Sequence, residues 1–422
     1  MNSRERLSRT LDHREPDRVV LDLGATSQTG ISASALYGLR KALGLAEKPI
    51  TIQEPAQILG QVDEDLRQAL GVDVVGLWNP GNTLGVPNRD WKPWSMPDGT
   101  PTLMAGGMAF SRDEDGATYT YPQGDPNLAP SMKMPSGGYF FDNIDRGGSY
   151  DEDHLDARAD FAGDFGIFDD ETALHLETES KRLFEETNYG IVGMCGGGGF
   201  GDVFALPACW VKGQPQGIRR MEDWLMAHIL YPDYILELFE MQCDIALKNL
   251  EIYRQAVGNR IQVVWLSGTD FGTQNGPFAS VENYRQLYKP FHSRLNDWVH
   301  ANTGWKTFYH CCGSIVPLLD DFAESGIDIL NPVQCSAAGM DPGFLKERYG
   351  DRFVFWGGGV DTQQTLPFGT PAEVREQVRE RLATFAPGGG YVFNSIHNIV
   401  GKTPVENIVA FFEAFREYNE GM

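Results

Sequence analysis

The sequence predicts an α/β fold, a (β/α)8 TIM barrel with a β-rich insertion after its second strand. Apolar, β-branched runs that end at Gly, Asp, Asn or Gln recur along the 422 residues, and amphipathic helical patterns separate most of them. Eight such runs alternating with helices are typical of this barrel, whose active sites lie at the carboxyl ends of the strands. The runs are residues 18–24, 72–79, 189–196, 261–268, 305–310, 327–334, 353–359 and 390–394.

Each of the later strand runs is followed by a helical pattern of suitable length. The first of these helices starts with Pro232 in its first turn. The last has the Thr cap, the first-turn Pro and the later Glu of a capping box at Thr370, Pro371 and Glu373. The expected helices are residues 232–257, 281–303, 314–325, 342–349 and 370–386.

The alternation stops between about residue 87 and about residue 170, where Gly, Pro, Asp and aromatic residues are frequent. Hairpin turns are expected at 97–99 (Pro-Asp-Gly) and at 113–116, the latter before the strand-like run 117–121. We interpret this segment as a β-rich excursion within a single TIM-barrel domain that spans residues 1–422. It would cover the barrel mouth or form a subunit contact in a homodimer.

The composition indicates a globular protein and argues against a membrane span and against nucleic acid as a partner. Hydrophobic residues make up 41% of the chain, and no apolar run approaches the roughly 18 residues of a membrane span. The first nine residues lack the apolar core of a signal peptide, and the six cysteines show no disulfide-framework spacing. A net charge of −23 with only 35 Lys and Arg argues against nucleic acid binding. We therefore expect a cytoplasmic protein that acts on a small molecule.

A candidate metal site follows from two of the strand ends. His310 and Cys312 are two residues apart, so in an extended strand an imidazole and a thiolate would lie on the same face. These are donors that Zn²⁺ prefers, and a catalytic zinc needs three protein ligands and an open position. His397, shortly after the last strand, is the candidate third ligand. The alternative is that Cys311 and Cys312 are small core residues and His310 a hydrogen-bonded core residue.

Two acidic residues at the same face are candidate catalytic groups. Asp270 lies two residues beyond the fourth strand, where it could be a fourth ligand, a general base or the acceptor for a ligating histidine. Asp361 follows the seventh strand. The alternative for both is a cap of the adjacent turn.

Several other polar residues at strand ends could orient a substrate, although each could instead satisfy loop backbone. One tryptophan near these ends could wall an aromatic pocket or simply fill the barrel. The candidate substrate-binding residues are Gln274, Asn331, Gln334, Asn394 and Trp356.

With the strand order and these motifs, the chain resembles the uroporphyrinogen decarboxylase superfamily, and most closely its branch of zinc-dependent, cobalamin-linked methyltransferases. The resemblance covers nearly the whole chain and is densest from about residue 268 to residue 415. The matching motifs are 269–274 (Thr-Asp-Phe-Gly-Thr-Gln), 310–313 (His-Cys-Cys-Gly), 326–334, 357–361, 388–391 and 403–408.

The resemblance implies a cofactor, a partner and one departure from the branch. The methyltransferases hold zinc through a His-x-Cys-Gly pair, matched by His310 and Cys312, and a later Cys, whose position is His397 here. A second imidazole in place of a thiolate would leave the metal more electrophilic. The chain has no Asp-x-His-x-x-Gly corrinoid motif, so a corrinoid would arrive on a separate protein.

The resemblance thus implies a zinc-dependent methyltransferase that moves a methyl group between a corrinoid protein or small methylated substrate and a thiol or pterin acceptor. The alternative is a metal-assisted or metal-free lyase or decarboxylase of a small carboxylated substrate. Uroporphyrinogen itself is not expected as the substrate. The decarboxylase grips it with an arginine-rich stretch in an early strand, and residues 21–28 contain no arginine.

Overall fold

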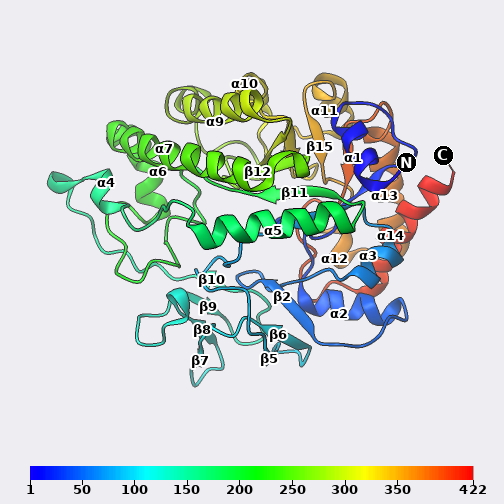
Figure 1. Ribbon diagram of the computed structural model, residues 1–422, viewed down its shortest axis with the longest axis horizontal. Helices are drawn as coiled ribbons and strands as arrows, with labels where there is room; N and C mark the ends of the chain where they lie inside the picture. Colours follow the sequence, from blue (N-terminus) through cyan, green and yellow to red (C-terminus); the bar gives the residue numbers. More distant parts are fainter. Residues whose placement is uncertain (422) are drawn as a thin grey trace.

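The computed structural model, which describes residues 1–421, is an α/β fold with the predicted (β/α)8 barrel (Figure 1). Its eight parallel strands are neighbours in the order β1-β16-β15-β14-β13-β12-β11-β4, and each lies within one of the predicted runs. The strands are β1 (Val20–Leu21), β4 (Val74–Leu77), β11 (Gly190–Met194), β12 (Val263–Ser267), β13 (Lys306–His310), β14 (Ile329–Asn331), β15 (Val354–Trp356) and β16 (Tyr391–Phe393).

A buried aspartate joins the two ends of this sheet. The backbone N–H of Asp73, just before β4, donates to the carbonyl of Leu21 in β1 (2.8 Å), and its carboxylate accepts from the Leu21 N–H (3.1 Å). Arg6 and Arg18 pair with the same carboxylate at 2.7 and 2.8 Å. Since a buried carboxylate needs a counter-ion, the two arginines stabilise the seam between β1 and β4.

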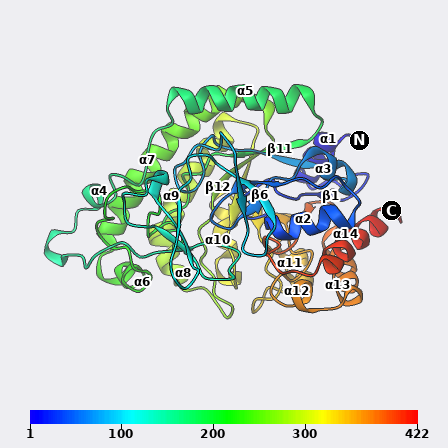
Figure 2. The same ribbon diagram turned by 90° about the horizontal axis from the view of Figure 1, so that it is seen from below.

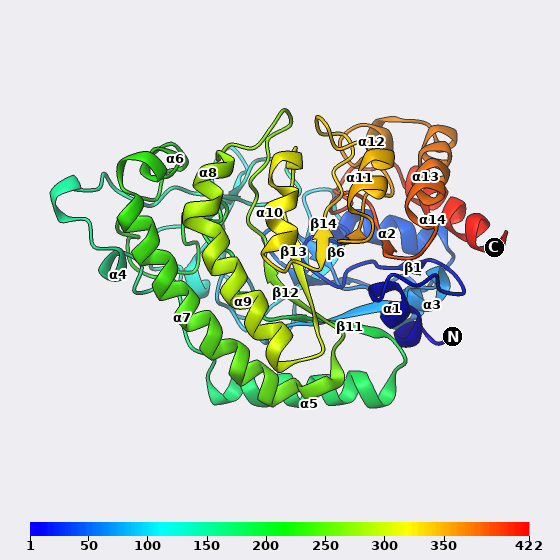
Figure 3. The ribbon, with the colours of Figure 1, turned by 90° about the horizontal axis from the view of Figure 1, so that it is seen from above.

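The helices cover the outside of the barrel, and the two chain ends lie on the same side of it (Figures 1 and 3). The predicted capping box is present at Thr370 and Glu373. The helix expected at 281–303 contains a π-helical turn, Tyr284–Tyr288. The α-helices are α1 (Ser3–Leu11), α2 (Ala33–Ala42), α3 (Glu64–Leu70), α4 (Ala157–Asp160), α5 (Asp170–Glu186), α6 (Met221–Leu230), α7 (Pro232–Val257), α8 (Val281–Asn283), α9 (Lys289–Asn302), α10 (Leu319–Glu324), α11 (Pro342–Tyr349), α12 (Thr365–Phe368), α13 (Pro371–Phe385) and α14 (Val405–Glu420).

The β-rich segment forms two small sheets beside the barrel, in blue and cyan in Figures 1 and 2. Both predicted hairpin turns are present, between β5 and β6 and between β7 and β8. One sheet has the order β10-β9-β8-β7 and the other β3-β2-β6-β5. The hairpin of β2 and β3, which precedes β4, therefore joins the later segment through the pairing of β2 with β6. The strands are β2 (Ile50–Glu54), β3 (Leu59–Gly60), β5 (Lys92–Ser95), β6 (Pro101–Met104), β7 (Phe110–Arg112), β8 (Thr118–Thr120), β9 (Met132–Met134) and β10 (Asp142–Asn143).

Buried apolar side chains form two clusters, one inside the barrel and one outside it. Inward side chains such as Val192, Phe308, Trp356 and Val392 fill the barrel, and a larger cluster lies between the strands and the helices. Within residues 1–421, no helix is long and apolar enough to cross a membrane.

Candidate metal-binding site

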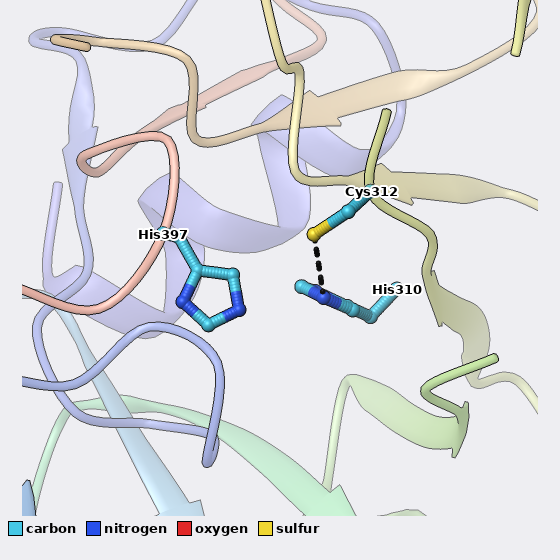
Figure 4. Close-up of side chains that lie close together, drawn as sticks. All are labelled: His310, Cys312 and His397. Atoms are coloured by element: carbon cyan, nitrogen blue, oxygen red, sulfur yellow. Dashed lines mark hydrogen bonds between the residues drawn. The ribbon is translucent and has the colours of Figure 1, made fainter. Parts of the chain in front are cut away.

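The structure brings His310, Cys312 and His397 together at the carboxyl ends of β13 and β16 (Figure 4). One donor atom from each of the three lies within 4.8 Å of the others. Nε2 of His310 is 3.3 Å from Sγ of Cys312. Tetrahedral zinc with bonds of ~2.1 Å to nitrogen and ~2.3 Å to sulfur would set these atoms roughly 3.5 Å apart. The donor types and spacing therefore fit zinc.

A neighbouring strand fixes the orientation of the first histidine. The register of β13 and β14 places His310 beside Asn331, whose Oδ1 lies 2.6 Å from Nδ1 of the imidazole. The Asn331 Nδ2 donates to the carbonyl of Trp356, so its Oδ1 is the acceptor and Nδ1 of His310 carries the proton. The lone pair of Nε2 then faces Cys312, as a metal ligand requires.

The second histidine is held differently. Nδ1 of His397 accepts a hydrogen bond from the backbone N–H of Asn398 (2.8 Å). The His397 ring lies nearly perpendicular to that of His310, at 77° with centroids 5.2 Å apart. A metal would bind His397 at Nδ1 in exchange for this hydrogen bond, or at Nε2 after a change of tautomer.

Burial sets the charge of all three side chains. It lowers the pKa of His310 and of His397 to about 4, so both imidazoles are neutral at neutral pH, the form that binds metals. Burial raises the pKa of the Cys312 thiol well above its usual value. A metal ion would therefore displace a proton from this thiol when it binds.

Asp270 supports the same loop from β12. Its Oδ1 accepts from the backbone N–H of Cys312 at 2.6 Å and lies 3.8 Å from Nε2 of His310. Burial raises the pKa of this carboxyl group. This position is compatible with each of the predicted roles of Asp270, including the capping alternative.

Asp361 lies outside this cluster. Its carboxylate accepts from the backbone N–H groups of Gln363 (2.7 Å) and Gln364 (3.2 Å). These contacts correspond to the cap of a turn and do not support the predicted catalytic role.

The predicted substrate-binding amides contact the protein itself. Asn331 orients His310, as described above. The Oε1 of Gln334 accepts from the Gly313 N–H at 2.7 Å, and Nε2 of Gln274 donates to the carbonyl of Ser336. Because buried amides must be satisfied, Asn331 and Gln334 hold loops in place, and direct substrate contact is not supported for them. Gln274 is exposed and makes its contact at the surface.

The other two predicted residues face the barrel interior. Trp356 is fully buried, and its Nε1 donates to Oδ2 of Asp22 at 2.8 Å. Asn394 donates to the carbonyls of Asp22 and Thr29. Burial raises the pKa of Asp22 to about 6. The packing alternative thus fits Trp356 better than a pocket wall.

A cavity of about 460 Å³ adjoins the cluster, lined by Asp270, His310 and His397 among others. It also contains residues that the sequence analysis missed. Two of them could have been predicted from their positions in the sequence. Asn398 directly follows His397, and Asp202 directly follows the glycine-rich run 196–201 after the third strand. Glu54 and Tyr139 could not, because they come from the β2–β3 hairpin and from the β-rich segment.

The barrel, the cluster at its strand ends and the adjoining cavity define an enzyme of the α/β-barrel class. The sequence profile described as uroporphyrinogen decarboxylase (URO-D) matches residues 181–418, and the chain belongs to this family.

Similar curated proteins match only in part. The uroporphyrinogen decarboxylase of Actinobacillus succinogenes is 32% identical over 106 residues (24% of this chain, 27% of that protein). That of Psychromonas ingrahamii is 36% identical over 103 residues (23% and 28%). That of Mannheimia succiniciproducens is 27% identical over 157 residues (36% and 41%). The chain thus spans well under half the length of these relatives.

A solved structure matches over the full length. A methyltransferase from Methanosarcina mazei has a TM-score of 0.52 and 17% sequence identity, with 99% of each chain covered. At this identity the likeness shows a shared barrel fold.

Proposed function

We propose that this protein is a zinc-dependent methyltransferase. It would move a methyl group between a corrinoid protein or a small methylated substrate and a thiol or pterin acceptor. The observation that carries the proposal is the convergence of His310, Cys312 and His397 beside a cavity, with the lone pair of His310 already directed at Cys312. The fold shared with a methyltransferase supports it.

Zinc bound there would lower the pKa of an acceptor thiol and keep it as a reactive anion at neutral pH. The residues of the chain prepare this step. Asn331 fixes the tautomer of His310, and Asp270 holds the backbone of Cys312 in place. The cavity provides space for the two reactants next to the ligands.

The alternative, a lyase or decarboxylase of a carboxylated substrate, has less support. No Lys or Arg occurs among the described residues that line the cavity, so a carboxylate would find no counter-ion there. A corrinoid-carrying partner and a cytoplasmic location belong to the methyltransferase proposal.

The test is metal content by elemental analysis after zinc loading and dialysis. We expect about one zinc per chain in the wild type and none in Cys312→Ala. Cys335→Ala is the matched control, since Cys335 is half-buried, outside the cluster, and contacts the Val333 carbonyl. Retention of zinc by Cys312→Ala, or its absence from the wild type, contradicts the proposal.

The activity assay follows from the same site. With methylcobalamin and a small thiol, the wild type is expected to form the methyl thioether, and Cys312→Ala is not. Equal thioether formation by both proteins would show that the cluster is not the methyl-transfer site.

A further inference from the structure

The cavity has an unbalanced charge. Four carboxyl groups line it, those of Glu54, Asp142, Asp202 and Asp270. In the part of the chain that the structure describes, none of them pairs with a Lys or Arg, and Asp270 lies near His310 and His397. Asp142 is exposed to solvent, so the carboxyl groups that remain without a Lys or Arg partner among the described residues are those of Glu54, Asp202 and Asp270.

Two buried carboxylates away from the cavity pair with arginine, although Asp22 does not and accepts from Trp356 Nε1 and the Ala25 N–H instead. Asp73, fully buried, pairs with Arg6 and Arg18. Asp164 pairs with the buried Arg219 at 2.5 Å. Because the fold compensates these buried carboxylates with arginine, the lack of a partner cation distinguishes the cavity from these sites.

Two of the cavity carboxyl groups are poorly compensated: Asp202 accepts few hydrogen bonds, and Glu54 has little contact with solvent. Asp202 accepts one hydrogen bond, from the N–H of Phe204 (2.9 Å). Glu54 is 5% exposed and accepts from the Thr83 hydroxyl and from two backbone N–H groups of its own turn. Burial raises the pKa of Glu54, and it raises the pKa of Asp202 to about 7. A cation beside these two carboxyl groups would stabilise their ionised forms and lower their pKa again.

The remaining lining suits a ligand that is both cationic and apolar. Phe141 and Phe204 contribute aromatic rings, whose faces attract cations. The ring of Tyr139 already has Nζ of Lys402 5.4 Å from its centroid. Ser32 is 1% exposed, and its hydroxyl has no hydrogen-bond partner among the described residues. The side-chain oxygen of Asn143 is likewise buried and without a partner there. Both residues line the cavity.

We propose that the small substrate bound in this cavity is an organic ammonium ion that carries N-methyl groups. The inference rests on the methyl transfer proposed above and names its substrate class. The carboxylates of Glu54 and Asp202 balance the positive charge, and the aromatic rings contact the methyl groups. A volume of about 460 Å³ holds a small molecule of this kind.

The transfer balances without a further reactant. The acceptor thiol loses its proton to solvent and becomes a thiolate. The bond between nitrogen and one methyl carbon then breaks with its electron pair left on nitrogen, while the carbon forms a bond to the thiolate sulfur. The ammonium ion becomes a neutral amine and the thiolate a neutral thioether.

The test compares two ligands of the same shape by isothermal titration calorimetry with the full-length protein. Choline carries a trimethylammonium group, and 3,3-dimethylbutan-1-ol carries an uncharged tert-butyl group in its place. We expect choline to bind at least ~10-fold more tightly, since desolvated carboxylates and aromatic faces favour the cation. Equal or tighter binding of the alcohol, or no saturable binding of choline, overturns the inference.

A matched pair of variants locates the site. Asp202→Asn removes a charge but keeps the acceptor for the Phe204 N–H, and choline affinity is expected to fall about 10-fold with that of the alcohol unchanged. Asp125→Asn is the control, because Asp125 accepts in the same way from the N–H of Asn127 and lies outside the cavity. Unchanged choline affinity in Asp202→Asn contradicts the inference.

The outcome is separable from that of the proposed function. Zinc bound in a wild type that does not bind choline rejects the ammonium substrate alone. Choline binding by a wild type that holds no zinc rejects the methyltransferase proposal and leaves the cation site in place.

Discussion

Two parts of the cavity lining are built on different principles. The strand-end lining, formed by Asp270, His310 and His397, has its groups positioned by neighbouring strands and loops through hydrogen bonds. The loop lining, which includes Glu54 and Asp202, has carboxyl groups that no Lys or Arg of the described chain neutralises. The difference matches the two proposals, a metal ion at the first part and a ligand from solution at the second.

The largest effect is expected from His397, the proposed ligand that stands where the methyltransferase branch has a Cys. His397→Ala should weaken zinc binding by ~100-fold or more, because it removes one of three ligands that share a binding free energy of about 10–16 kcal/mol. His397→Cys should retain zinc, since a thiolate is an equally suitable donor. Competition with a chromophoric chelator measures both. Unaltered zinc affinity in His397→Ala would remove His397 from the ligand set.

A smaller effect is expected from the residue that orients His310. Asn331→Ala should lower zinc affinity roughly 10- to 100-fold, because the imidazole loses the partner that fixes its tautomer. Asn394→Ala is the control, an equally buried strand-end amide that contacts the carbonyls of Asp22 and Thr29 instead. If both variants lose zinc affinity alike, Asn331 acts only through general stability.

The buried carboxyl group beneath the strand ends gives a pH-dependent effect. The pKa of Asp22 rises from 3.8 to about 6 on folding because of burial, so the folded state binds the proton more tightly than the unfolded state. The contribution of Asp22 to the free energy of unfolding is therefore fully present below about pH 4 and is lost as the pH rises to about 6. Between pH 4 and pH 6, the free energy of unfolding of Asp22→Asn should therefore rise by about 3 kcal/mol relative to that of the wild type.

Urea unfolding of both proteins at pH 4, 5, 6 and 7 measures this difference. The free energies of unfolding should diverge between pH 4 and pH 6 and then run parallel. A constant difference at all four pH values would show that Asp22 does not titrate in this range.

The smallest effect tests whether the loop lining is independent of the metal. Thr83→Val removes the hydroxyl that donates to Glu54 (2.8 Å) and should lower the free energy of unfolding by about 1 kcal/mol. Zinc content should stay at the wild-type value, because Thr83 does not contact the cluster. Loss of zinc in a folded Thr83→Val would show that the two parts of the lining are coupled.

Much of the barrel could be predicted because its signals are local. Every barrel strand lies within a predicted run, and α7 and α11 have the predicted bounds. The alternation of Ile50 and Ile52 with polar residues was a similar local signal for β2, although its partners in β6 could not be known from the sequence. Pairing between distant segments depends on the whole fold, so the addition of β2 and β3 to the predicted hairpin of β5 and β6 was missed.

The sequence by itself determined the fold class, the strand ends and the proximity of His310 to Cys312, because these follow from side-chain periodicity and the spacing of two residues. Only the tertiary structure decided what the neighbouring side chains do. Asn331 faces His310 because of the register between β13 and β14, whereas Trp356 and Asn394 face the barrel interior. The sequence also did not show that Glu54 and Asp202 line one cavity, since they are 148 residues apart and meet only after folding.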